Sequence, residues 1–137
     1  MKYDEIQELM QSSYGTENYH RINPFCPYVV VTDGMLTVLE KAECFWLFDM
    51  MASYYPEMKK SNEYFFVAKL KVKKNNSAEF SIVYEKYDYE KEDGVDVKLC
   101  SQKIPFTDLP CGEYKFFIGT QPVEDKTYYV IMCPSEY

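Results

Sequence analysis

The chain has 137 residues, a length typical of one domain, and 47% of them are hydrophobic, which excludes an intrinsically disordered protein. Its formal net charge of −7 argues against a general nucleic-acid-binding protein, because such proteins carry basic surfaces that displace counterions from phosphates. The 14 Tyr and 9 Phe favour strands, so we expect a substantial sheet.

The first segment, residues 2–12, is predicted to form a short amphipathic helix that ends at Gly15. Residues 14–28 contain two prolines and a glycine, which indicates an irregular, aromatic-rich connection. His20 and Arg21 lie in this connection. A single histidine in a loop is typical of a surface residue, and a ligand or a general base is the alternative interpretation.

The central stretch, residues 29–55, contains the longest helical pattern of the chain. A short β-branched strand at residues 28–31 precedes it, and Thr32 or Asp33 can cap the helix by accepting a hydrogen bond from a free backbone N–H. Apolar residues then recur at spacings of three and four as far as Trp46, which predicts an amphipathic helix.

The same helical face continues to Asp49, so a straight helix would place a carboxylate within an apolar stripe. The helix either breaks near Cys44, which turns Asp49 to water, or its second half is buried on all sides. In the second case Asp49 needs a partner such as Arg21, a lysine or tyrosine hydroxyls, because an unpaired buried carboxylate costs several kcal/mol. A structural hydrogen-bond hub explains such an acid more simply than catalysis does. Pro56 is expected to end the helix.

A hairpin is expected after a polar linker at residues 57–63. From Tyr64 to Val72 alternate positions are apolar, and the opposite face carries three lysines. This pattern is typical of a hairpin with one solvated face rather than a phosphate site. The lysines are Lys69, Lys71 and Lys73. A three-residue loop at residues 75–77 would pair Val72 with Phe80 and keep the core residues on one face.

Residues 85–96 are the most acidic segment, with six acidic residues against two lysines. The alternating acids suggest a calcium loop, but Asp93 occupies the position where that loop requires glycine, so we predict no metal site. Tyr87 and Tyr89 near this turn can form a partner surface, because tyrosine provides contact area at low entropic cost. A solvated loop is the simpler interpretation of this segment and the one that its composition favours.

Strands are further predicted at residues 95–104, 114–118 and 128–133. The predicted fold is therefore α+β, with one or two N-terminal helices packed on an antiparallel sheet of about five strands. We expect a single domain over residues 1–137, helical to about residue 56 and sheet-forming from about residue 64 to 133.

Five cysteines occur without a CxxC pair, which supports neither a zinc ribbon nor a thioredoxin-like site. The acidic N-terminal segment lacks the apolar core of a signal peptide, and no apolar run approaches the ~20 residues of a membrane span. We therefore expect a cytoplasmic protein with reduced thiols and no membrane association.

Several segments resemble those of a small family of uncharacterised bacterial and phage proteins, catalogued as a domain of unknown function. The resemblance covers nearly the whole chain and implies a cytoplasmic protein of bacteria or their mobile elements, without implying an activity. The segments that carry it are GTENYHR (residues 15–21), VTDG (31–34), WLFDMMASYY (46–55), KLKV (69–72), QKIPFTDLP (102–110) and the closing PSEY.

We expect an acidic interaction or regulatory protein, from a phage or mobile element, that binds a host protein. The alternatives are a small-molecule module, with a pocket lined by tyrosines and Trp46, or a hydrolase-like enzyme that uses a buried Asp49 with a nearby His, Arg or Cys. No catalytic residue, cofactor, metal or direct nucleic-acid binding is predicted, and exposed edge strands would permit a homodimer. The candidate binding residues are His20, Arg21, Trp46, Asp49, Tyr87 and Tyr89.

Overall fold

The computed structural model describes residues 1–12 and 18–137, which form four α-helices, seven strands and a short 3₁₀ helix. The α+β class is confirmed, but the prediction of one or two helices and about five strands was too low. Gly15, predicted to end the first helix, lies outside the described residues. The elements are α1 (Tyr3–Gln11), β1 (Tyr19–Arg21), β2 (Val29–Thr32), α2 (Asp33–Lys41), α3 (Phe45–Ala52), α4 (Tyr55–Ser61), β3 (Phe65–Val72), β4 (Ala78–Asp88), β5 (Asp93–Ile104), β6 (Gly112–Val123), β7 (Lys126–Met132) and η1 (Pro134–Glu136).

The strands form one sheet in the order β1-β2-β7-β6-β3-β4-β5. Neighbours run antiparallel except for β2 and β7, which pair in parallel with Val30 opposite Val130. The sheet is therefore mixed, and the expectation of a purely antiparallel sheet was wrong. The additional strand β1 comes from the segment predicted to be irregular, where Tyr19–Arg21 pairs with β2.

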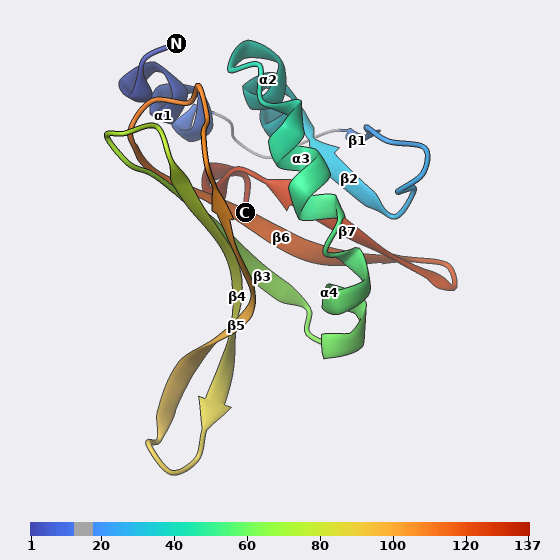
Figure 1. Cartoon of the computed structure of the whole chain (residues 1–137). Helices are drawn as coiled ribbons and strands as arrows, with labels where there is room; N and C mark the ends of the chain where they lie inside the picture. Colours follow the sequence, from blue (N-terminus) through green and yellow to red (C-terminus); the bar gives the residue numbers. More distant parts are fainter. Residues whose placement is uncertain (13–17) are drawn as a thin grey trace.

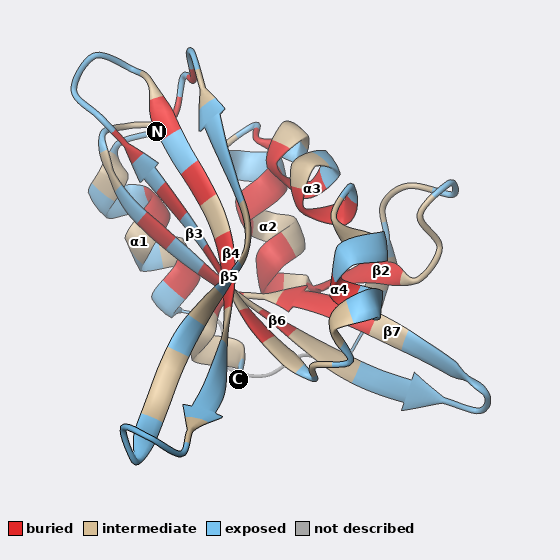
Figure 2. Cartoon of the chain, turned by 60° about the horizontal axis from the view of Figure 1, so that its bottom comes forward, coloured by how far each residue is buried: buried red, intermediate tan, exposed pale blue. Residues whose placement is uncertain are grey.

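All four helices contribute to a core on one face of the sheet (Figure 1). Figure 2 shows the buried segments of the strands in red, and most of these residues belong to the same core cluster as the helices. Burial of apolar surface in this core stabilises the fold by roughly 25 cal/mol per Å². This hydrophobic free energy is the main contribution that holds the helices and the sheet together. The largest fully buried side chains include Phe48, Phe66, Phe80, Phe116, Leu47 and Met58.

The central helix breaks, as the first of the two interpretations of Asp49 required. Glu43 adopts a left-handed conformation with φ of 52°, and the Cys44 N–H donates to the Leu39 carbonyl at 3.0 Å. This pattern is a Schellman C-cap, which ends α2 and turns the chain before α3 begins. The turn rotates α3 so that Leu47, Phe48 and Met51 face the core and Asp49 is exposed.

The predicted linker at residues 57–63 is mostly a helix. Pro56 does not end the preceding helix but lies in the first turn of α4, where the fixed φ of proline fits and its missing N–H costs nothing. Met58 is buried and anchors this helix to the core. The helix ends at Asn62, which has φ of 57°.

The β3–β4 hairpin has the predicted faces but a different register. Val72 pairs with Ala78 rather than Phe80, because the three-residue loop occupies residues 74–76 instead of 75–77. The third loop residue is Asn76, with φ of 65°, and asparagine tolerates this left-handed position better than serine does. A shift of two residues leaves every side chain on its predicted face.

Candidate functional site

The most prominent surface feature is a hairpin that extends beyond the rest of the sheet. β3 pairs with β4 only as far as Val83, whereas β4 and β5 remain paired out to Asp88 and Asp93. Residues 84–97 therefore form a two-stranded hairpin without a third strand, which we call the arm. It is the yellow ribbon that leaves the body of the molecule in Figure 1, and none of its residues is buried (Figure 2).

A β-bulge marks the point where the arm leaves the sheet. Ile82 pairs with Cys100 but Val83 pairs with Lys98, so that Leu99 has no opposite residue. A bulge bends its strand and increases the local twist, which redirects the residues beyond it. The bulge therefore accounts for the divergence of the arm from the neighbouring strands.

Two exposed tyrosines occupy the outer part of the arm. Tyr87 is 52% and Tyr89 is 85% exposed, and their rings meet edge to face with centroids 4.8 Å apart. Val95 and Val97 from the opposite strand line the same shallow hollow. The arm thus combines an aromatic pair with apolar neighbours, although it is surrounded by water.

The acidic residues of the arm face one another. Glu85 lies opposite Asp96, and Asp88 lies opposite Asp93. Like charges in directly opposite positions destabilise a hairpin. Among the described residues, the only ion pair that includes an acid of the arm joins Lys69 Nζ to Asp96 at 3.9 Å. The fold therefore leaves most of the arm's negative charge without a cationic partner.

The sequence-predicted residues His20 and Arg21 both lie in β1. His20 is half-buried, and its Nε2 is 2.6 Å from Oδ1 of Asp33 at the start of α2. Arg21 is exposed and pairs through its backbone with Val30 of β2. The imidazole thus connects the edge strand to α2, a contact that belongs to the fold.

Trp46 and Asp49 both lie on α3 and line one hollow together with Pro105. Asp49 is exposed, and no ion pair in residues 1–12 or 18–137 joins it to His20 or Arg21. The structure thus places Trp46 and Asp49 in one hollow and brings Tyr87 close to Tyr89, whereas His20 contacts Asp33.

A carboxylate near the C-terminus organises a contact that the sequence did not indicate. Glu136 accepts hydrogen bonds from the Thr32 hydroxyl at 2.6 Å, the Gly34 N–H at 3.1 Å and the Cys133 N–H at 3.0 Å. The Thr32 hydroxyl in turn accepts from the Met35 N–H and caps α2. The VTDG and PSEY segments therefore meet at the N-terminus of this helix.

Comparison with known proteins identifies a family but no activity. No curated protein and no solved structure matches the chain. None of the helices in the described part of the chain is both long and apolar enough to cross a membrane. A family model described as a family of unknown function, DUF6876, matches residues 4–137, nearly the whole chain. The chain therefore belongs to the DUF6876 family.

Proposed function

We propose that this protein is a protein-binding module, from a bacterium or one of its mobile elements, that uses the arm to bind a basic surface of a host protein. The observation that carries the proposal is the exposed Tyr87–Tyr89 pair on a hairpin without buried residues. Tyrosine is enriched at protein interfaces, where its ring becomes buried and its hydroxyl remains hydrogen-bonded.

The structure of the arm supports a partner rather than a role in the fold. An isolated two-stranded hairpin is marginally stable in water, so the arm gains stability when a second surface covers it. The opposed carboxylates, such as Glu85 and Asp96, repel each other in the free protein. Lysines and arginines of a partner would relieve this repulsion and accelerate association.

The partner and compartment follow from charge and composition. A net charge of −7 supports a basic protein partner rather than direct contact with nucleic acid. Five cysteines in free form support the cytoplasm, where thiols stay reduced. The edge strands β1 and β5 leave room for a homodimer as a second mode of association.

The enzyme hypothesis required a buried Asp49, and this carboxylate is exposed. We therefore do not assign Asp49 a catalytic role. The small-molecule hypothesis placed Trp46 in a tyrosine-lined pocket, but the two hollows that Trp46 lines in the described part of the chain contain no tyrosine.

The proposal is tested by comparing the proteins that three immobilised forms retain from a lysate of the cells that encode the chain. The forms are the wild type, the Tyr87→Ser/Tyr89→Ser double variant and the control Phe25→Ser, which removes an aromatic side chain that is 92% exposed outside the arm. We expect the wild type and the control to retain a basic protein that the double variant does not retain. A higher salt concentration should elute this protein. If the double variant retains every protein that the wild type retains, the arm is not the binding element.

A further inference from the structure

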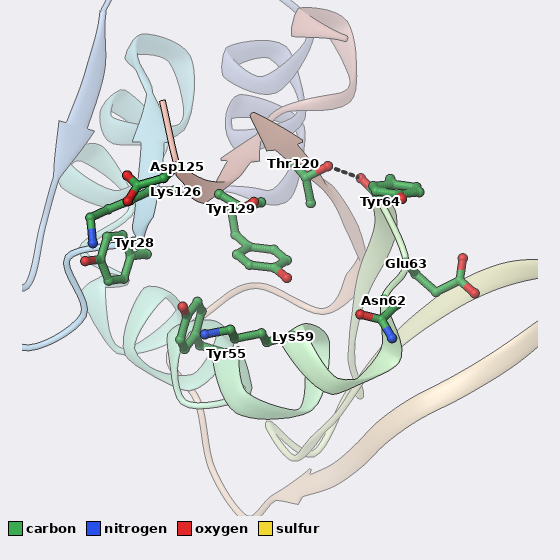
Figure 3. A pocket seen from close by; sticks show the side chains of 11 residues that line it. Tyr28, Tyr55, Lys59, Asn62, Glu63, Tyr64, Thr120, Asp125, Lys126 and Tyr129 are labelled. Atoms are coloured by element: carbon green, nitrogen blue, oxygen red, sulfur yellow. Dashed lines mark hydrogen bonds between the residues drawn. The ribbon is translucent and has the colours of Figure 1, made fainter. Parts of the chain in front are cut away.

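Another hollow, on a different part of the molecule from the arm, lies between α4 and the β6–β7 hairpin (Figure 3). Its volume is about 440 Å³, within the roughly 300–1,000 Å³ typical of small-molecule sites. We call it the tyrosine hollow and define it by Tyr28, Tyr55, Lys59, Lys126 and Tyr129. These residues come from the connection before β2, from α4 and from β7, so only the folded chain assembles the site.

Three aromatic rings form the wall of the tyrosine hollow. The rings of Tyr28 and Tyr55 are nearly parallel, at 26° with centroids 6.3 Å apart, and Tyr129 meets Tyr55 edge to face at 5.5 Å. Tyr28 and Tyr55 are half-buried, so parts of both rings remain open to the hollow. An arrangement of this kind offers stacking surface to a planar molecule.

Two lysine ammonium groups lie against these rings. Lys59 Nζ is 6.0 Å from the centroid of the Tyr55 ring, and Lys126 Nζ is 5.1 Å from that of Tyr28. Lys59 follows Tyr55 by one helical turn, which places both on one face of α4. Neither ammonium group forms an ion pair with any residue that the structure describes. Two positive charges therefore lie beside the rings, with Lys126 also in a side-chain hydrogen bond with Tyr28, and both ammonium groups can pair with an anion.

Two carboxylates also line the tyrosine hollow, and their placement decides its polarity. In Figure 3 the Glu63 carboxylate points away from the rings, on the opposite side of the view from Tyr28. Asp125 is exposed and lies at the hairpin turn next to Lys126. The surface between the rings is therefore aromatic, with Lys59 and Lys126 beside it, Glu63 away from the rings and Asp125 next to Lys126.

From this arrangement we infer that the tyrosine hollow binds a planar aromatic molecule that carries a negatively charged group. The ring of the ligand stacks on Tyr55 and Tyr28, and its anionic group accepts hydrogen bonds from Lys59 and Lys126. A nucleoside monophosphate and an aromatic carboxylate share this chemistry.

The inference is tested by titrating the intact protein with four probes and measuring the melting temperature and the dissociation constant. Adenosine 5′-monophosphate and indole-3-acetate carry both a ring and an anion, whereas adenosine lacks the anion and inorganic phosphate lacks the ring. A ligand that binds only the folded state raises the melting temperature. We expect at least one of the two aromatic anions to raise it, and adenosine and phosphate to have smaller effects. Whichever of the two aromatic anions binds more tightly shows whether the site prefers a phosphate or a carboxylate group.

Matched variants locate the binding. Lys59→Ala should weaken binding of the aromatic anion by about tenfold, the effect of one charge-assisted hydrogen bond. Lys60→Ala is the control, because this neighbour on α4 is exposed and does not line the tyrosine hollow. Tyr55→Phe keeps the ring and should retain binding, while Tyr55→Ser should lose it.

The inference is overturned if neither aromatic anion shifts the melting temperature at millimolar concentration, or if adenosine binds as tightly as its monophosphate. Equal binding by the Lys59→Ala and Lys60→Ala variants would also overturn it. Because the arm is a separate surface, the Tyr87→Ser/Tyr89→Ser variant should bind the probes as the wild type does, and the result is independent of the protein partner.

Discussion

At the scale of single residues, Glu136 accepts three hydrogen bonds that connect distant parts of the chain. Its carboxylate joins β2, α2 and the end of β7, and its bond to Thr32 spans 104 positions of sequence. Glu136→Ala should lower the free energy of unfolding by about 1–3 kcal/mol, because it leaves the Thr32 hydroxyl and two backbone N–H groups without their acceptor. Urea denaturation measures this loss. Glu90→Ala, on the exposed arm, is the control and should change the free energy of unfolding by less than about 0.5 kcal/mol. Equal losses of stability in the two variants would contradict the account.

Gly112 is the residue whose backbone most clearly excludes a side chain. Its φ is 149°, and an added Cβ would lie 2.3 Å from the Tyr3 ring, which packs on Tyr114. Gly112→Ala should therefore lower stability by about 1–3 kcal/mol through strain and displacement of α1. Gly119→Ala is the control, since its Cβ would meet only the flexible end of Met132 at 3.3 Å. Similar denaturation midpoints for the two variants would show that the Tyr3 contact does not constrain Gly112.

At the scale of elements, the arm is separable from the fold. Replacing residues 86–95 with Asn-Gly would join Glu85 to Asp96, which lie directly opposite each other, through a favoured two-residue turn. Because no residue of the arm is buried, the unfolding free energy should change by less than about 1 kcal/mol. A loss of several kcal/mol in thermal or urea unfolding would show instead that the arm is part of the core structure.

The success of sequence-based prediction differed between elements for physical reasons. Period-two alternation identified the faces of β3 and β4, but the register depended on which loop residue accepts a left-handed conformation, and Asn76 accepts it. The sequence analysis missed α4 because Met58 is its only buried residue and the neighbouring residues are charged, so no apolar face is visible in the pattern. In addition, Pro56 can start a helix as well as follow one. The pattern reversal after Glu43 correctly indicated that a helix break was one of two solutions.

The candidate site was predictable only in part. The exposure of Tyr87 and Tyr89 agrees with the tyrosine-bearing turn expected from local composition. In contrast, the tyrosine hollow draws on Tyr28, Tyr55 and Tyr129, which only the packing of α4 against the sheet brings together. No local pattern encodes such a contact. Lys59 was not recognised as a binding residue because residues 57–63 were predicted to form a polar linker.

At the scale of the whole molecule, stability should fall in alkaline solution. Burial raises the pKa of the Cys44 thiol from 9.0 to about 11 and, with the nearby Glu136, that of Cys133 to about 12. Burial also raises the pKa of the Tyr114 hydroxyl, which donates to the Pro110 carbonyl. These groups lose their protons more readily in the unfolded state, so their contribution is complete below about pH 9 and declines as the pH rises towards the folded-state values.

Urea midpoints between pH 8 and pH 11 measure this decline. A Cys44→Ala/Cys133→Ala variant should show a shallower decline, because both buried thiols are absent. Cys111→Ser is the matched control at an exposed cysteine and should follow the wild type. A wild-type midpoint that does not change between pH 8 and pH 11 would contradict the burial of these groups.

The central claim is that the arm binds a protein, and site-specific photo-crosslinking tests it most directly. Tyr89 and, as a control, Phe25 are each replaced by p-benzoylphenylalanine, at positions that are 85% and 92% exposed. Each variant is irradiated in the cells that encode the chain. The account predicts a crosslink from position 89 to a basic protein that is absent from position 25. No crosslink at position 89, or the same crosslinks at both positions, would contradict it.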